Sequence, residues 1–368
     1  MTDTEFREVV AVLSANGLDA AAFVPGPNFM RLMGRDFHLM ERPLLLIVPR
    51  EGPPLAIVPN LELASFASIG FQGHVFDWRD QDGFEGAFRL LAEARPDLAN
   101  GKIGLEGQRM RVFEQMALAT VFPEAVFFDA HSELSTIRLR KTDIEIANLR
   151  AAIRISEQAL EATVTEVKIG MTEMQVQGIL LRELFAQGAE ALAFDPIVAA
   201  GDNSAQPHAH ARTDYRIKSG DALLFDFGAK YKGMNADITR TFFVGTASSY
   251  DTEFYNTVLA ANTRGKEVTK AGETAHAVDD AVQQVLEQSQ FAQYVRHKTG
   301  HGLGLDVHEA PQIMRGNDTV LETGITFTVE PGLYRPGECG VRIEDDVLVT
   351  EEGHECLTSF PRDLRIIG

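Results

Sequence analysis

The chain has 368 residues, 45% hydrophobic and 24% charged, which is an ordinary soluble composition and enough length for two domains, each with its own core. Asp and Glu outnumber Lys and Arg by 53 to 34, giving a formal net charge of −19. This argues against nucleic acid and anionic membranes as partners, because phosphate binding needs clustered basic residues. The opening MTDTEFREVV has no basic region followed by an apolar core, and no apolar run is long enough to span a bilayer, so we expect a cytoplasmic protein.

Short apolar, β-rich runs alternate with helical patterns in the first third of the chain. Strands are predicted at PLLLIVP (43–49), KIGLEG (102–107) and AVFFDA (125–130), and helices at GFEGAFRLLAEAR (83–95) and RVFEQMALATVF (111–122). This alternation is typical of an α/β domain, which we assign to residues 1–134.

A long amphipathic helix within residues 135–163, capped by Thr142, opens a second region with a different pattern. Further helices are predicted over 172–188, 252–271 and 275–288, and strands near 193–199, 222–227, 238–244, 326–330 and 341–350. We therefore assign residues 135–368 to an α+β domain built from hairpins. The order of helix pair, hairpin, helix pair and hairpin is also what a diverged duplication would leave.

Two of these hairpins carry paired carboxylates. In LLFDFGAKYKGMNADITRTF, strands that pair symmetrically about the glycine-containing turn would present Asp226 and Asp237 on one face, about 5 Å apart. FTVEPGLYRPGECGVRIEDD repeats the arrangement with Glu330 and Glu344. Four crowded carboxylates repel one another unless cations lie between them, so two divalent ions with one imidazole would make a consistent site.

Each of these features has a simpler interpretation when taken singly. An Asp at a strand end is usually a turn former, and the DFG triplet lacks the other motifs of a kinase. His301 and His308, seven residues apart in KTGHGLGLDVHEAP, do not have the spacing of a helical zinc site. Cys339 and Cys356 are too few for a disulfide framework and are read as idle thiols.

The joint order of the motifs resembles the pita-bread metallopeptidase family, which includes prolidase, aminopeptidase P and methionine aminopeptidase. The resemblance spans residues 134–360, and GHGLGLDVHE and VRIEDDVLVT look like the prolidase and aminopeptidase P branch. PGPNFMRLMG is similar to that branch's first domain, although the usual Tyr-Leu-Thr-Gly reads Arg31-Leu-Met-Gly34 here. The resemblance implies an α/β N-terminal creatinase-like domain followed by a C-terminal α+β pita-bread domain.

Position by position, the resemblance also implies a set of site residues. The metal ligands would be Asp226, Asp237, His301, Glu330 and Glu344. The groups acting in catalysis would be Glu330, His208, His297, His308 and Arg342. In this scheme Asp237 and Glu344 bridge two divalent ions, His308 contacts the substrate carbonyl, and His208 faces the bound peptide. His210 matches no family position and is read as solvated, whereas Arg240 is expected to support its hairpin.

The implied reaction is hydrolysis of the Xaa-Pro bond at the N-terminus of dipeptides or short peptides. A water shared by the two ions would lose its proton and attack the carbonyl, while Glu330 shuttles the proton. Ligands of four oxygens and one nitrogen favour manganese, with cobalt, iron and zinc as alternatives.

The substrate range and the oligomeric state remain open from sequence. Some prolidases bind a dipeptide's carboxylate with an Arg at the position of Gln312. Dipeptidase activity and aminopeptidase P activity are therefore both kept as alternative predictions. A non-peptidase hydrolase or lyase of a small osmolyte is the alternative from another class. Such proteins are commonly homodimers, and the loop near Asp36 and His38 would approach the neighbouring active site.

Overall fold

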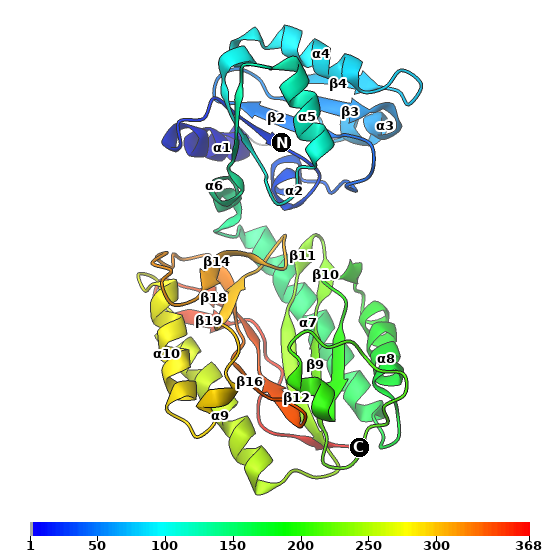
Figure 1. The fold of residues 1–368 in the computed structure, drawn as a ribbon, viewed down its shortest axis with the longest axis vertical. Helices are drawn as coiled ribbons and strands as arrows, with labels where there is room; N and C mark the ends of the chain where they lie inside the picture. The colour runs from blue at the N-terminus through cyan, green and yellow to red at the C-terminus, as the bar shows by residue number, and fades with distance from the viewer. Residues whose placement is uncertain (1–2) are drawn as a thin grey trace. The chain divides into compact units, whose positions relative to one another are not determined.

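The structure, a computed structural model, describes residues 3–368, and the chain divides after Arg138 into two compact units (Figure 1). The boundary predicted between residues 134 and 135 lies inside a short helix, α6 (His131–Ser135). The long helix predicted to be capped by Thr142 begins at Asp143, as expected. In the segment before it, Arg140 forms a β-bridge with Ile325 and the Lys141 amide donates to the carbonyl of Gly324. None of the described residues forms a helix with the length and hydrophobicity needed to cross a membrane.

The N-terminal unit is a six-stranded mixed sheet with helices on both faces. The strands run in the order β4-β3-β2-β1-β5-β6. Their bounds are β1 Ala20–Phe23, β2 Leu45–Pro49, β3 Leu55–Pro59, β4 His74–Trp78, β5 Lys102–Leu105 and β6 Val126–Asp129. The other helices are α1 Asp3–Ala15, α2 Pro27–Met33, α3 Leu63–Ala67, α4 Glu85–Ala94 and α5 Val112–Val121.

Alternation along the central strands divides the core of this unit into two. Ala21 and Phe23 of β1 pack into the cluster that contains residues of α1 and α2, whereas Ala20 and Ala22 pack into the cluster on the side of α4 and α5. All four residues of β1 are buried, so the strand lacks the alternation between apolar and polar residues that a half-exposed strand shows. The sequence patterns predicted β2, β5 and β6 but not β1, β3 or β4, and burial does not separate the two sets, since β2 is fully buried as well.

The C-terminal unit places one helix pair on each side of its strands, as Figure 1 shows. Helices α7 (Asp143–Glu166) and α8 (Glu173–Ala186) pack with the sheet β20-β12-β9-β8, and α9 (Ser249–Val268) and α10 (Ala275–Glu287) share a core with β17. The strands of the first half are β7 Ala191–Leu192, β8 Ile197–Ala200, β9 Ala222–Phe227, β10 Ala229–Tyr231, β11 Met234–Asn235 and β12 Ile238–Val244. Those of the second half are β13 Gly300–Gly302, β14 Glu309–Ile313, β15 Thr326–Val329, β16 Gly332–Arg335, β17 Cys339–Arg342, β18 Asp345–Val349, β19 His354–Cys356 and β20 Ile366–Ile367.

Local capping fixes where the first two helices of this unit begin. The Thr142 hydroxyl accepts from the amide of Glu145, whose side chain accepts from the Thr142 amide in return. Thr172 and Gln175 form the same capping box at the start of α8. Because each cap satisfies helix amides that would otherwise lack partners, these starts could be predicted from sequence.

The first carboxylate hairpin is symmetric about a turn at Lys232 and Gly233, whose φ angles are 45° and 83°. In the resulting register Asp226 pairs with Thr239, so Asp237, two residues before Thr239, is a diagonal neighbour of Asp226 on the same face. The two acids therefore share a face as expected but are not directly opposite each other. Gly228 lies between β9 and β10, and an added Cβ there would lie 1.6 Å from the carbonyl oxygen of Ala236.

The second carboxylate hairpin brings its acids to the same end of two neighbouring strands. Val329 of β15 pairs with Asp345 of β18, so Glu330 directly follows the last pair and Glu344 directly precedes it. The intervening chain forms a separate two-stranded ribbon, β16–β17. The single strand predicted near residues 341–350 is therefore two strands, interrupted at Ile343 and Glu344.

Candidate metal centre

The predicted ligands converge in one buried cluster of the C-terminal unit. Three groups of side chains each have donor atoms within 4.8 Å of one another. The groups are Asp226 with Asp237 and Glu344, His301 with Glu330 and Glu344, and Asp237 with His301 and His308. All five expected ligands occur in these groups, and His308 joins them.

Backbone hydrogen bonds hold the segments that carry these side chains together. The Glu330 amide donates to the carbonyl of Thr299 at 2.8 Å, and the Glu344 amide donates to that of Thr239 at 3.1 Å. The first bond joins the segment of His301 to the end of β15, and the second joins the two carboxylate hairpins. The cluster is thus built on strand ends that are fixed relative to one another.

The carboxylates of the cluster carry more negative charge than their protein neighbours balance. Burial, together with the charge of neighbouring acids, raises the pKa values of Asp237 and Glu344 well above their usual range. Burial also opposes ionisation of Glu330, but the hydrogen bond and charge of His301 lower its pKa to about 2. One oxygen of Asp237, Oδ1, is buried and has no hydrogen-bond donor. A cation would satisfy this oxygen and relieve the repulsion.

The tautomer of His301 fits a metal ligand. Nδ1 lies 3.1 Å from the carbonyl oxygen of Gly302, which can only accept, so Nδ1 carries a hydrogen. Nε2 faces Glu330 Oε1 at 3.2 Å and Asp237 Oδ2 at 3.7 Å. Nε2 therefore either holds a proton against these acids or directs its lone pair at a cation between them. Four carboxylates with one imidazole suit an oxygen-preferring divalent ion.

A chain of hydrogen bonds links the predicted residues Arg342 and His297 through Tyr334. Arg342 forms an ion pair with Asp226 and donates to the Tyr334 hydroxyl at 2.6 Å. His297 Nδ1 donates to the carbonyl of Lys298, so its Nε2 accepts from Tyr334 at 2.8 Å. Burial lowers the pKa of His297, which agrees with a neutral ring. Sequence reasoning did not single out Tyr334, although it lies in the quoted GLYRPG stretch.

The two remaining predicted histidines lie at exposed positions. His308 is at the rim of the cluster, with its ring edge-on to His301 at a centroid distance of 4.2 Å. Burial and the charge of His301 lower the pKa of His308, which favours the neutral ring. His208 and His210 line a separate hollow beside helix α8 and belong to none of the three donor groups.

A buried ion pair that the sequence did not reveal fixes the segment of His308. Lys141 binds Glu309, the residue after His308, and both side chains are almost fully buried. Lys141 directly precedes Thr142, the cap of α7, and lies 168 positions before Glu309 in the chain. Its ion pair therefore fixes the backbone next to His308 to the start of that helix.

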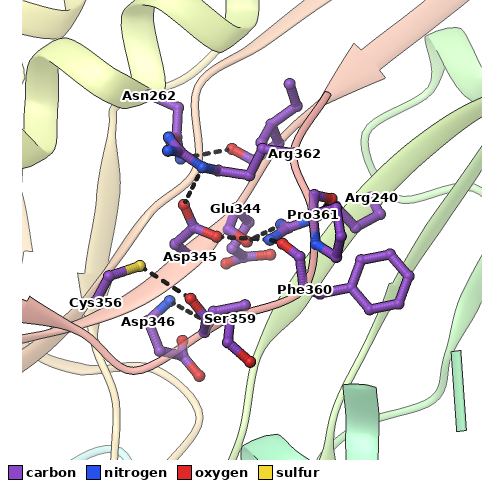
Figure 2. A network of polar contacts seen from close by, with 12 residues as sticks. Arg240, Asn262, Glu344, Asp345, Asp346, Cys356, Ser359, Phe360, Pro361 and Arg362 are labelled. Atoms are coloured by element: carbon purple, nitrogen blue, oxygen red, sulfur yellow. Dashed lines mark hydrogen bonds and ion pairs between the residues drawn. The ribbon is translucent and has the colours of Figure 1, made fainter. Parts of the chain in front are cut away.

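Asp345 follows Glu344, but its carboxylate faces Arg240 and Arg362 (Figure 2). Its carboxylate accepts from Arg240 at 2.7 Å, pairs with Lys266, and lies 3.8 Å from Arg362. Burial opposes ionisation, yet Arg240 and Lys266 hold the pKa of Asp345 below its usual range. Arg240 also donates to the carbonyl of Glu344 at 2.6 Å, so it supports the hairpins as expected.

Known proteins resemble the chain over almost its whole length. Residues 147–351 match metallopeptidase family M24, and residues 7–140 match the creatinase/prolidase N-terminal domain. An uncharacterized peptidase of Staphylococcus saprophyticus is 31% identical over 97% of this chain and all of its own length. A solved Xaa-Pro dipeptidase from Bacillus anthracis is 32% identical, with a TM-score of 0.90 over 99% of both chains. A solved X-Pro aminopeptidase from Thermotoga maritima is 31% identical, with a TM-score of 0.83 over 98% of this chain and 99% of its own.

These matches confirm both the family resemblance seen in the sequence and the predicted fold class. The chain belongs to metallopeptidase family M24 and combines a creatinase/prolidase N-terminal domain with a C-terminal pita-bread domain.

Proposed function

We propose that the chain is an exopeptidase that depends on two divalent ions and hydrolyses the Xaa-Pro bond at the N-terminus of dipeptides or short peptides. The observation that carries this proposal is the shared position of Glu344. Glu344 belongs both to the donor group with Asp226 and Asp237 and to the donor group with His301 and Glu330. A common carboxylate between two ligand sets would let two ions lie close together, as in two-metal hydrolases. The names of the Bacillus anthracis and Thermotoga maritima relatives supply the Xaa-Pro specificity.

In this proposal each residue of the cluster has one role in holding metal. Asp226 would bind one ion and His301 and Glu330 the other, with Asp237 and Glu344 between them. When bound, such ions lower the pKa of water toward neutrality and polarise a carbonyl group. We take manganese as the metal, with cobalt, iron and zinc as alternatives, because oxygen donors predominate.

The protein groups around the cluster then divide the proton transfers and the contacts with substrate. The nitrogen of an Xaa-Pro bond carries no hydrogen, so it must receive a proton as the bond breaks. Glu330, whose carboxylate contacts His301, would accept a proton from water and pass it to that nitrogen. His308, neutral and at the rim, would donate to the oxyanion, and His208 would face the peptide.

Arg342 and His297 would act from behind the ligands. The ion pair of Arg342 fixes the orientation of Asp226, and the Tyr334 hydroxyl joins Arg342 to His297. Because both ring nitrogens of His297 are engaged, its contribution is to orient Tyr334 and Arg342.

Metal analysis combined with a peptide assay tests this function. Dialysis against a chelator should abolish hydrolysis of Ala-Pro, and manganese or cobalt should restore it with about two ions bound per chain. Ala-Ala serves as the control substrate and should be cleaved far more slowly. Undiminished cleavage of Ala-Pro by protein that mass spectrometry shows to be free of metal would refute the proposal.

We also propose that the protein acts as a homodimer in which the loop near Asp36 and His38 approaches the neighbouring active site. Leu39 and Met40 of this loop expose 41% and 51% of their surface, which suits a contact with a second copy. Sedimentation should give a mass of two chains. A monomer with full activity would contradict this assembly.

A further inference from the structure

A pocket of about 590 Å³ is lined by residues of helix α9, of strand β19 and of the chain that follows β19, and we call it the Lys266 pocket. Its volume falls in the range of about 300 to 1,000 Å³ typical of ligand sites. None of the proposed metal ligands lines it. The side chains that do include Leu259, Thr263, Lys266, His354, Phe360 and Arg362.

Hydrogen bonds from other elements fix the C-terminal wall of the Lys266 pocket. Arg240 donates to the carbonyl of Phe360 at 2.7 Å (Figure 2), and Glu157 accepts from the amide of the same residue at 2.6 Å. The buried Tyr255 donates to the carbonyl of Arg362 at 2.7 Å. The wall is therefore held in place before a ligand enters, which lowers the ordering cost of binding.

Positive charge exceeds negative charge beside this pocket. The fully buried Asp345 accepts from Arg240 at 2.7 Å and pairs with Lys266, and the guanidinium of Arg362 lies 3.8 Å away (Figure 2). Three cations therefore surround one buried carboxylate. The acid that lines the pocket, Asp363, is exposed, so water and salt screen its charge. The imbalance is the reverse of the one at the metal centre.

The two cations that line the pocket keep N–H groups without an acceptor among residues 3–368. Lys266 is only 6% exposed and uses two of its three hydrogens, toward Asp345 and toward the Cys356 sulfur at 3.7 Å. Arg362 Nη1 donates to Asn262 at 2.9 Å, whereas its Nη2 donates to none of the described residues. The pocket therefore offers one ammonium and one guanidinium to an anion.

The rest of the lining indicates what kind of anion fits. Leu259, Phe360 and Pro361 give the pocket an apolar part. Burial lowers the pKa of His354, which favours the neutral ring and adds no further charge. The volume is far larger than a carboxylate group, so a ligand bound to the two cations has room for an apolar body against these side chains.

We infer that the Lys266 pocket binds a small organic carboxylate with an apolar body, held by Lys266 and Arg362. Arg240, Lys266 and Arg362 against Asp345 and Asp363 leave one positive charge, which a carboxylate balances and a phosphate dianion exceeds. The inference is independent of the proposed peptidase function, because no metal ligand takes part in it.

Isothermal titration calorimetry of the metal-loaded protein with N-acetyl-leucine tests this inference, and N-acetyl-leucinamide is the neutral control ligand. Wild type should bind the carboxylate at least about tenfold more tightly than the amide, and Arg362→Gln should lose about the same factor, because each change removes a charge-assisted hydrogen bond. Arg365→Gln is the matched control, since Arg365 pairs with Glu161 and does not line the pocket. It should bind like wild type.

Thr263→Glu is a second variant that supplies the carboxylate from the protein itself. The Thr263 hydroxyl already accepts from Arg362 at 3.2 Å, so a carboxylate at this position would occupy the same donors. This variant should bind no N-acetyl-leucine and should unfold at a higher temperature than wild type. If circular dichroism shows that Arg362→Gln is not folded, Thr263→Glu carries the test alone.

A carboxylate can also bind metal ions, and the two variants distinguish the two places. Equal affinity for N-acetyl-leucine in wild type, Arg362→Gln and Thr263→Glu would place the ligand at the metal centre and overturn the inference. The absence of binding to wild type, or equal affinity for N-acetyl-leucine and its amide, would overturn it too. Inorganic phosphate bound as tightly as N-acetyl-leucine would show that the pocket selects charge alone, so that the assigned apolar body is wrong. Cleavage of Ala-Pro by wild type is expected in every case, which keeps the two proposals separate.

Discussion

Glu344 and Asp345 are adjacent in sequence and both fully buried, yet the surroundings of the two side chains treat their charges in opposite ways. On one side, Glu344 lies among Asp226, Asp237 and Glu330, and its pKa is raised well above the usual value by burial and by its acidic neighbours. On the other side, Asp345 meets Arg240 and Lys266, and its pKa is lowered. Burial alone therefore does not mark a functional acid.

The difference lies in which cations the chain itself supplies. Asp345 is balanced by protein cations, so it stabilises the fold, whereas the cluster around Glu344 has an oxygen without any donor. A buried acid that the protein leaves unbalanced implies a ligand that carries the missing charge. Four tests with five substitutions examine this interpretation, from the largest expected effect to the smallest.

Glu344→Gln should have the largest effect, because a neutral amide replaces the carboxylate shared by the two donor groups. We expect loss of one of the two ions and a fall in kcat/KM greater than the roughly 100-fold that loss of an outer partner costs. Metal content by mass spectrometry and the Ala-Pro assay measure both quantities. Two tightly bound ions in this variant would show that Glu344 is not the shared ligand, and the contrast with Asp345 would fail.

Asp345→Asn should spare the ions and weaken the fold. It leaves Arg240 and Lys266 buried without their carboxylate, which costs about 3 to 5 kcal/mol. Unfolding by urea, followed by circular dichroism, would measure this loss. Glu355→Gln is the matched control, since Glu355 pairs with Arg150 at an exposed site worth at most about 1 kcal/mol. If Asp345→Asn lost metal without being destabilised, Asp345 would be a metal ligand and not a structural acid.

Glu106, at the end of β5 in the N-terminal unit, is an intermediate case. It accepts from the amide of Val24 and the side chain of Asn28, both neutral donors, and burial raises its pKa to about 7. The folded state then holds this proton more tightly than the unfolded state. The stability of the unit should therefore fall as pH rises from about 4.5 through 7, by about 3 kcal/mol in all.

Glu106→Gln should remove this dependence on pH, because an amide does not titrate over that range. Trp78, the one tryptophan of the chain, is buried in the same unit and reports its unfolding by urea through fluorescence. Wild type and variant should differ least near pH 5 and most above pH 7. If the free energies of unfolding of wild type and variant changed in parallel with pH, the charge of Glu106 would be balanced by its protein neighbours, like that of Asp345.

The two histidines of the cluster allow the smallest and most selective test. His301→Ala should lower metal content as well as rate, since its Nε2 faces two of the acids. His308→Ala should keep both ions and lower kcat by about 100-fold, the usual effect of removing one oxyanion donor. His308 also has a donor atom near Asp237 and His301, so equal metal loss in both variants would make it a ligand instead.

Local sequence determined much about this protein. The helices α7 and α8 begin where Thr142 and Thr172 complete capping boxes with residues three positions later, an interaction that needs no tertiary contact. Period-two alternation predicted that Asp345 would face away from Glu344, and the two side chains do have different partners. The ordered motifs around Asp226, His301 and Glu344 gave the family and the fold class.

Only the tertiary structure decided the contacts between residues far apart in the chain. The pairing of Asp226 with Thr239 depended on which two residues formed the turn, and Lys141 met Glu309 across 168 positions. The hollow beside His208 formed because β8 became the edge strand of its sheet, next to α8. No sequence pattern encodes such contacts, because pairing and edge position depend on how separate hairpins and helices pack, whereas caps and alternation depend on neighbours in the chain.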